Sequence, residues 1–320
     1  METRTDITAF ADKMGEIRRQ IADVIVGQAE TVDMLLTCLV ADGHVLLEGV
    51  PGVAKTLLAR LVARLVDARF SRIQFTPDLM PSDVLGTSVF NQKTSDFDFH
   101  AGPAFTDILL ADEINRAPAK TQAALFEVME ERQATVDGQT YDLGGLFTVI
   151  ATQNPVEQEG TYRLPEAQLD RFLMKIVIGY PSVDEEVEIL NRHNSRSGFA
   201  RLGDVRPVVS KEELCALRRM TDSVVVDVSL LRYIAQIVAQ SRESRAVYVG
   251  CSPRASVAML RSAKAYALLH DRDFVTPDDI KAVAPSVMQH RLQLTAEAEM
   301  EGYTPMAVAQ KLIENVEVPK

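Results

Sequence analysis

Residues Gly49–Thr56 read G-V-P-G-V-A-K-T and lie between the apolar run Val45–Leu47 and a helical pattern over Thr56–Val66. A glycine-rich loop between a strand and a helix binds phosphate, because its backbone N–H groups and the helix dipole both favour an anion there. We expect Lys55 to reach the β- and γ-phosphates and the Thr56 hydroxyl to hold Mg²⁺. The expected nucleotide contacts in the loop are Gly49, Val50, Pro51, Gly52, Val53, Ala54, Lys55 and Thr56.

One position departs from the strict pattern G-x-x-x-x-G-K-[ST], which has glycine where this chain has Ala54. If that backbone position needs a positive φ, alanine costs about 1–2 kcal/mol there. An ordinary glycine-rich turn between a strand and a helix is the alternative interpretation of this segment.

The composition is that of a soluble globular protein, with 47% apolar and 25% charged residues, and 320 residues favour two domains. No run approaches the roughly 18 apolar residues of a membrane-spanning helix, and the first 20 residues predict an amphipathic helix rather than a signal peptide. The three isolated cysteines suit a reducing compartment, so we expect a cytoplasmic protein. A net charge of −11 argues against broad binding to nucleic acid or anionic lipid.

The first half of the chain alternates short apolar runs with helical periodicity, which predicts a parallel sheet covered on both faces. The expected strands are Val45–Leu47, Phe70–Phe75, Ile108–Ala111, Phe147–Ala151 and Lys175–Ile178. Two segments, Thr87–Phe99 and Arg132–Leu143, instead alternate around a polar centre and predict hairpins that project from this core.

After about Pro181 the periodicity becomes helical throughout. We therefore expect an α/β nucleotide-binding core over residues 1–181 and an all-α lid domain over residues 182–320.

Hydrolysis of ATP needs a metal carboxylate, a group that orients water, and positive charge for the transition state. The apolar run Ile108–Ala111 ends in Asp112 and Glu113, at the edge of the sheet where ligands of such folds bind. Asp112 would hold Mg²⁺ through its water ligands, and Glu113 would act as the general base. Asn154, after the next strand, could bond both the water and the γ-phosphate. Solvated acids and an Asn-Pro turn are the alternatives for these residues.

Arg171 precedes the last expected strand, and Arg254 opens a helix in the sequence C-S-P-R-A. Arginine is the natural stabiliser of the charge that spreads over a transferred phosphoryl group. Taken alone, however, each of these two arginines is better explained as a solvated surface charge.

Several motifs together resemble the MoxR family of AAA+ ATPases, from about Ile25 to near the C-terminus. The matching stretches are E-G-V-P-G-V-A-K-T, A-D-E-I-N-R-A-P-A-K-T-Q, F-E-V-M-E-E-R-Q-A-T-V, A-T-Q-N-P-V-E-Q-E-G-T-Y-R-L-P-E-A-Q-L-D-R-F and G-C-S-P-R-A. The resemblance implies strand order 5-1-4-3-2 and a helical lid. It also implies a helix-2 insert over residues 87–99 and a pre-sensor-1 hairpin over residues 132–143, as in magnesium-chelatase ATPase subunits. Ala54 looks usual for this family.

By position, the resemblance makes Asn154 sensor 1, Arg171 the arginine finger and Arg254 sensor 2. Val26 and Gly27 match the segment that borders the adenine, and Arg116 is a candidate second interface arginine. An arginine finger acts on the nucleotide of a neighbouring subunit, so a ring is implied, with a hexamer as the expected form.

The resemblance further implies a chaperone-like remodeller that matures or assembles a partner complex, with metal insertion as one form of that role. A von Willebrand A-domain protein would be the adaptor. A nucleic-acid motor is a second hypothesis, disfavoured because Asp96 and Asp98 outweigh Lys93 in the first hairpin. A scaffold or switch without turnover is a third, disfavoured by the intact Lys55 and Glu113.

Overall fold

A parallel sheet of five strands lies at the centre of the computed structural model, which describes residues 4–155, 161–162, 164–194 and 201–319. Its strands are β1 (Val45–Gly49), β2 (Phe70–Gln74), β5 (Ile108–Asp112), β8 (Thr148–Gln153) and β9 (Met174–Ile178). They lie in the order β2-β5-β8-β1-β9, and every neighbouring pair is parallel. If the five strands are numbered 1 to 5 along the chain and the sheet is read from β9, the order is 5-1-4-3-2. The predicted fold class is therefore confirmed.

The register of the sheet brings the ends of three strands together at its carboxyl edge. Ala151 of β8 pairs with Leu46 of β1 on one side and with Ala111 of β5 on the other. The loop after β1 and the polar residues that follow β5 and β8 therefore meet at one edge, where ligands of open α/β sheets bind.

The central strands β1, β5 and β8 are mainly apolar on both faces because both faces are covered by helices. In β1, Val45 and Leu47 face a large hydrophobic core, and Leu46 between them faces a smaller one on the other side of the sheet. The large core packs against α1 (Arg4–Val24), α2 (Ala29–Val40) and α3 (Lys55–Leu65), and the small core against α4 (Pro81–Leu85) and α5 (Ala119–Glu131). The predicted N-terminal amphipathic helix is α1.

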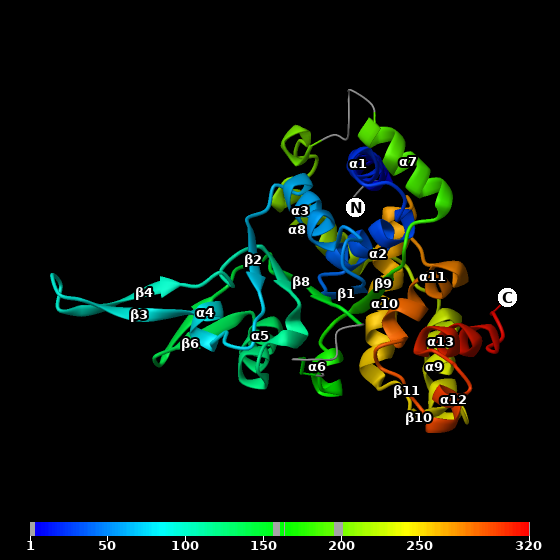
Figure 1. The fold of residues 1–320 in the computed structure, drawn as a ribbon. Helices are drawn as coiled ribbons and strands as arrows, with labels where there is room; N and C mark the ends of the chain where they lie inside the picture. The colour runs from blue at the N-terminus through cyan, green and yellow to red at the C-terminus, as the bar shows by residue number, and fades with distance from the viewer. Residues whose placement is uncertain (1–3, 156–160, 163, 195–200, 320) are drawn as a thin grey trace.

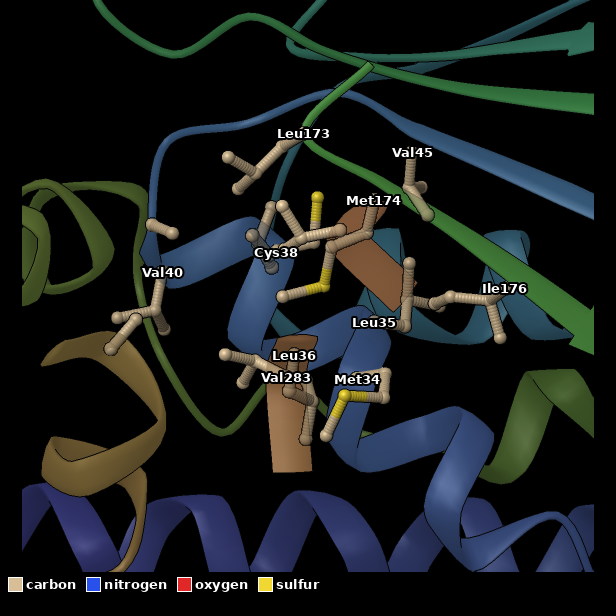
Figure 2. Close-up of a cluster of buried hydrophobic side chains, with 14 of the residues drawn as sticks. Met34, Leu35, Leu36, Cys38, Val40, Val45, Leu173, Met174, Ile176 and Val283 are labelled. Carbon is tan, nitrogen blue, oxygen red and sulfur yellow. The ribbon is translucent and has the colours of Figure 1, made fainter. Parts of the chain in front are cut away.

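The large core continues without interruption into the C-terminal helices. Figure 2 shows Leu35 and Cys38 of α2 between Met174 of β9 and Val283 of a C-terminal helix. Each of these side chains is at most 1% exposed. Helix α2 therefore joins the sheet to the helical half of the protein, and the division at residue 181 stays a prediction.

Helices make up most of the C-terminal half. They are α6 (Glu166–Leu169), α7 (Val183–Asn194), α8 (Lys211–Ser223), α9 (Val228–Glu243), α10 (Pro253–Leu269), α11 (Pro277–Met288), α12 (Ala296–Met300) and α13 (Pro305–Glu314), with the 3₁₀ turn η2 (Leu202–Asp204). Another 3₁₀ turn, η1 (Ile114–Arg116), follows β5 in the N-terminal half. One detail differs from the all-helical expectation, because β10 (Val247–Val249) pairs with β11 (Gln293–Leu294). Strands this short leave no detectable alternation in the sequence. No helix in the described part of the chain is long and apolar enough to cross a membrane.

Two hairpins project from the sheet, in the two segments that alternate around a polar centre. Strands β3 (Gly86–Asn91) and β4 (Asp96–Ala101) form a long arm that extends away from the helices (Figure 1). Strands β6 (Gln133–Val136) and β7 (Gln139–Asp142) form a shorter one, whose turn residues Asp137 and Gly138 both have positive φ. The rings of Phe99 and Tyr141 stack 4.0 Å apart between the arms.

Candidate active site

The loop Gly49–Thr56 joins the carboxyl end of β1 to the start of α3, and each of its two glycines has a structural reason. Gly52 has φ of +91°, which favours glycine. At Gly49 a Cβ would lie 2.8 Å from the carbonyl oxygen of Ile178, so no larger residue fits between β1 and β9. The loop is thus shaped by local backbone needs and by the neighbouring strand.

Ala54 adopts the left-handed conformation, with φ of 61° and ψ of 20°, immediately before the first residue of α3. A Cβ in this region meets the following carbonyl oxygen and costs roughly 1–2 kcal/mol. The departure from the glycine pattern at this position therefore stores strain at the start of the helix.

Replacing Ala54 with glycine should stabilise the nucleotide-free protein by about 1 kcal/mol, because glycine relieves that strain. The measurement is the midpoint of denaturant unfolding without nucleotide. Ala123→Gly is the matched control: it removes the same methyl from an exposed position inside α5 and should destabilise by about 1 kcal/mol. Equal effects of both variants would contradict a strained Ala54.

Lys55 lies within the loop, where its ammonium group donates to three backbone carbonyls. The acceptors are the carbonyl of Gly49, that of Val50 at 3.4 Å, and that of Gln153 at the end of β8, also at 3.4 Å. The group that would reach the phosphates is thus held between the ends of two neighbouring strands.

The segment Val26–Gln28 lies against the same loop. The Gln28 side-chain amide donates to the carbonyl oxygen of Val53 at 3.2 Å. Gly27 has φ of +71° and approaches the carboxylate of Glu185 in α7 so closely that a Cβ would collide with it. Gly27 and Gln28 therefore lie between the loop Gly49–Thr56 and α7, with Val26 directly before them in the chain. This is the position expected of a segment beside a nucleotide base.

Asp112 ends β5 and is almost fully buried, with its carboxylate held by three side chains. The Thr152 hydroxyl donates to Oδ1 at 2.5 Å, and the Thr56 hydroxyl donates to Oδ2 at 3.3 Å. Arg72 of β2 also donates to Oδ2, from Nη2 at 2.7 Å. The two residues expected at the metal, Thr56 and Asp112, thus lie together.

This pair of oxygen ligands fits Mg²⁺, which is usually bound through one or two protein oxygens, with phosphates and waters completing its coordination. The described residues contain no group of three or more histidine, cysteine or acidic side chains that could hold a metal on its own. A cation at this edge would therefore need the nucleotide as a further ligand.

Glu113 has a left-handed backbone, with φ of 56° and ψ of 49°, an unusual conformation for this residue type. Its N–H donates to the Thr152 hydroxyl at 2.9 Å. Its carboxylate accepts from Gln74 of β2 at 2.6 Å and pairs with Arg116 at 3.2 Å. Such strained backbones concentrate at functional sites, so Glu113 is a strong candidate for chemistry.

Asn154 is buried directly after β8, at the same edge of the sheet as the phosphate loop and the acidic pair. The structure therefore brings together Lys55, Thr56, Asp112, Glu113 and Asn154. Residues 156–160 and 163 of the matching motif 151–172 lie outside the described residues.

Arg171 and Arg254 are not part of this group. Strand β9 is parallel to β1, with Met174 opposite Val45 and Ile178 opposite Gly49. Arg171 precedes the amino end of β9, whereas the phosphate loop follows the carboxyl end of β1. At about 3.3 Å per residue, the strand alone separates them by roughly 13 Å.

The two arginines instead meet each other at Glu130, in the last turn of α5. Arg171 Nε donates to Glu130 Oε2 at 2.7 Å, and Arg254 Nη2 donates to Oε1 at 3.1 Å. Both line a cavity of about 630 Å³ at this end of the molecule. The structure thus contains two separate groups of candidate residues, one at each end of the sheet.

Four residues with contacts in these groups were not predicted from the sequence: Arg72, Gln74, Thr152 and Glu130. Arg72 and Gln74 share one face of β2 because side chains alternate along a strand. Two long polar side chains on one face of a strand are only a weak sign of a functional site. Their acidic partners, Asp112 and Glu113, lie at the end of a different strand. Only the sheet order places β2 beside β5.

Comparison with known proteins places the chain in a family. Residues 44–174 match the model "ATPase family associated with various cellular activities (AAA)", and residues 239–312 match "AAA lid domain". The chain is 48% identical to protein YeaC of Bacillus subtilis, over 96% of this chain and 95% of that protein. It is 43% identical to the chaperone MoxR1 of Mycobacterium tuberculosis, over 94% of this chain and 81% of that protein.

A crystal structure from Cytophaga hutchinsonii, described as a candidate ATPase, has the same fold. It superposes with a TM-score of 0.89 at 41% identity and covers 99% of this chain and 98% of its own. The identity to MoxR1, the AAA and lid matches and the arrangement of the sheet agree with one another. The chain therefore belongs to the MoxR family of AAA+ ATPases.

Proposed function

We propose that this MoxR-family ATPase hydrolyses Mg²⁺-ATP at the interfaces of a ring of identical subunits, with a hexamer as the expected form. The observation that carries the proposal is the separation of its two groups of polar residues. Lys55, Asp112 and Glu113 lie at the carboxyl edge of the sheet, and Arg171 and Arg254 lie beyond its amino edge. One subunit therefore holds a nucleotide-binding half and an arginine half that do not meet within it.

Each residue at the carboxyl edge has a role that its placement supports. Lys55 neutralises the β- and γ-phosphates, and the backbone of residues 49–56 cradles them. Thr56 would hold Mg²⁺ directly and Asp112 would hold it through its water ligands; the bound ion would supply positive charge beside the phosphates. Glu113 accepts a proton from the attacking water, and Asn154 orients that water against the γ-phosphate.

The arginines complete the site of the neighbouring subunit. Arg171 and Arg254 share one carboxylate, so they move together and act on the same nucleotide. We therefore assign Arg254, like Arg171, to action in trans. A guanidinium supplied in this way stabilises the charge on the γ-phosphoryl group in the transition state.

The biological role that we propose is a chaperone-like one, in the maturation or assembly of a partner complex, including insertion of a metal cofactor. The name of the similar chaperone MoxR1 supports this role. The exposed Phe90 and Phe97 of the β3–β4 arm favour a protein client over nucleic acid, since Asp96 and Asp98 lie beside them. A von Willebrand A-domain protein is the proposed adaptor.

Replacing Lys55 with alanine should weaken ATP binding by about 100-fold, since a charge-assisted contact to phosphate is worth up to about 3 kcal/mol. Binding of a fluorescent ATP analogue and release of phosphate with Mg²⁺ are the two measurements. Lys93→Ala removes an exposed lysine from the distant arm and should change neither. Unchanged affinity in Lys55→Ala, or no phosphate release by the assembled wild type, would refute the proposal.

A further inference from the structure

Glu130 accepts hydrogen bonds from both Arg171 and Arg254, and no other carboxylate in the described part of the chain does so. It lies in the last turn of α5, whereas Arg171 follows α6 and Arg254 begins α10. Each of its carboxylate oxygens accepts from a different arginine, Oε2 from Arg171 at 2.7 Å and Oε1 from Arg254 at 3.1 Å. Three elements that are far apart in the sequence are thus joined by one side chain.

The other carboxylate close to Arg254, that of Asp170, is already paired with another arginine. Asp170 Oδ2 lies 3.8 Å from Arg254 Nη1, but Asp170 Oδ1 accepts from the buried Arg291 at 2.6 Å. Arg254 therefore depends mainly on Glu130 for a close carboxylate. Its side chain is 61% exposed, so without that partner it would sample many rotamers in water.

Two neighbouring guanidinium groups repel each other unless an anion lies between them. Glu130 supplies that anion. The hydrogen bond from Arg171 lowers the pKa of the Glu130 carboxyl, burial opposes this effect, and Arg254 lowers the pKa further. The carboxylate thus stays ionised at neutral pH and keeps both cations in place.

Both arginines retain N–H donors for a further ligand. Arg171 uses Nε for Glu130 and Nη1 for the carbonyl oxygen of Ala167 at 3.3 Å, and a guanidinium carries five N–H donors in all. Its cationic carbon also lies 6.0 Å above the ring of Phe126. The guanidinium is therefore oriented on one side and open to the 630 Å³ cavity on the other.

Glu130 contributes to neither hydrophobic core. Its side chain is 37% exposed, and α5 packs through other residues, such as Leu125 and Met129. We propose that Glu130 is a positioning residue that holds Arg171 and Arg254 as one cationic pair, oriented toward the γ-phosphate of ATP bound to the neighbouring subunit. This inference rests on the proposed function, in which the two arginines act in trans.

Glu130→Ala should lower kcat for ATP hydrolysis by about 100-fold, the effect expected when catalytic groups lose their geometry. The dissociation constant for ATP should stay within about twofold, because the subunit's own phosphate loop is intact. Glu131→Ala is the matched control: it removes the next carboxylate of the same helix, which is exposed, and should leave kcat within about twofold. Normal kcat in Glu130→Ala would overturn the inference.

Mixed rings distinguish a positioning role in trans from a structural one. Glu130→Ala subunits keep an intact ATP site, and Glu113→Gln subunits keep an intact arginine pair, so mixing two inactive proteins should restore turnover. Arg171→Ala mixed with Glu113→Gln is run in parallel, with co-assembly shown by native mass spectrometry. Rescue of Arg171→Ala but not of Glu130→Ala would refute the inference and leave the proposed function standing.

Failure of both mixtures, despite co-assembly, would instead refute action in trans and with it the proposed function. Where Glu130→Ala does not assemble, Glu130→Gln is taken through the same two measurements. The Glu130→Gln substitution keeps the size of the side chain and removes its charge. Full activity of Glu130→Gln would overturn the inference, since a neutral amide cannot hold two cations together.

Discussion

Arg171→Ala should lower ATP turnover by about 10³-fold or more, the magnitude typical of an arginine that acts in trans on a transferred phosphoryl group. The affinity for ATP should remain within about twofold of wild type. The reason is geometric: Arg171 lies beyond the amino end of β9, roughly 13 Å along the strand from the loop that we propose binds the nucleotide of its own subunit. Removing it leaves that loop unchanged.

The measurements are steady-state phosphate release and equilibrium binding of an ATP analogue on the assembled protein. Arg219→Ala, which removes an exposed arginine from α8, is the control for the loss of a positive charge. It should hydrolyse ATP at the wild-type rate. Loss of ATP affinity in Arg171→Ala that matches the loss of turnover would contradict the assignment, since it would place Arg171 in the ground-state binding site.

Glu113→Gln should slow hydrolysis by about 10²–10⁴-fold and leave ATP bound, because an amide cannot accept the proton of the attacking water. The variant keeps the size of the side chain and the backbone N–H that donates to Thr152 at 2.9 Å. The strained backbone at this position should therefore persist. Thr56 and Asp112, which we propose hold Mg²⁺, are also unchanged.

A single-turnover experiment with radiolabelled ATP separates binding from chemistry in this variant. The label should stay on intact ATP bound to the protein, whereas wild type converts it to ADP. Glu127→Gln changes an exposed glutamate of α5 in the same way and should turn over normally. If Glu113→Gln hydrolysed ATP at the wild-type rate, another group would have to be the base.

Local sequence patterns predicted the central sheet closely. All five strands were located to within one or two residues. The central strands β1, β5 and β8 were the clearest, since a strand buried on both faces is a short, nearly continuous apolar run. The turn at Asp137-Gly138 was predictable for a similar reason, because it depends on the φ preference of two adjacent residues. The strain at Ala54 followed from a single departure from a motif.

Side-chain contacts between different helices and strands were harder to predict from the sequence. Arg72 and Gln74 bind the acidic pair only because β2 lies beside β5, and Glu130 joins the two arginines only because α5 ends near the start of α10. Such contacts depend on sheet order and helix packing, which no single segment encodes. The family resemblance named the arginines, but the structure supplied the carboxylate between them.

One large hydrophobic core runs from the sheet through α2 into α10 and α11, and it limits how one half of the subunit can move against the other. A lid attached through a flexible linker could close on its nucleotide without disturbing the rest of the subunit. Here the same buried side chains support both halves, so bending one against the other would open a close-packed interior. In the proposed ring we therefore expect each subunit to move as a rigid body, with hydrolysis changing the angle between neighbouring subunits rather than the shape of any one of them.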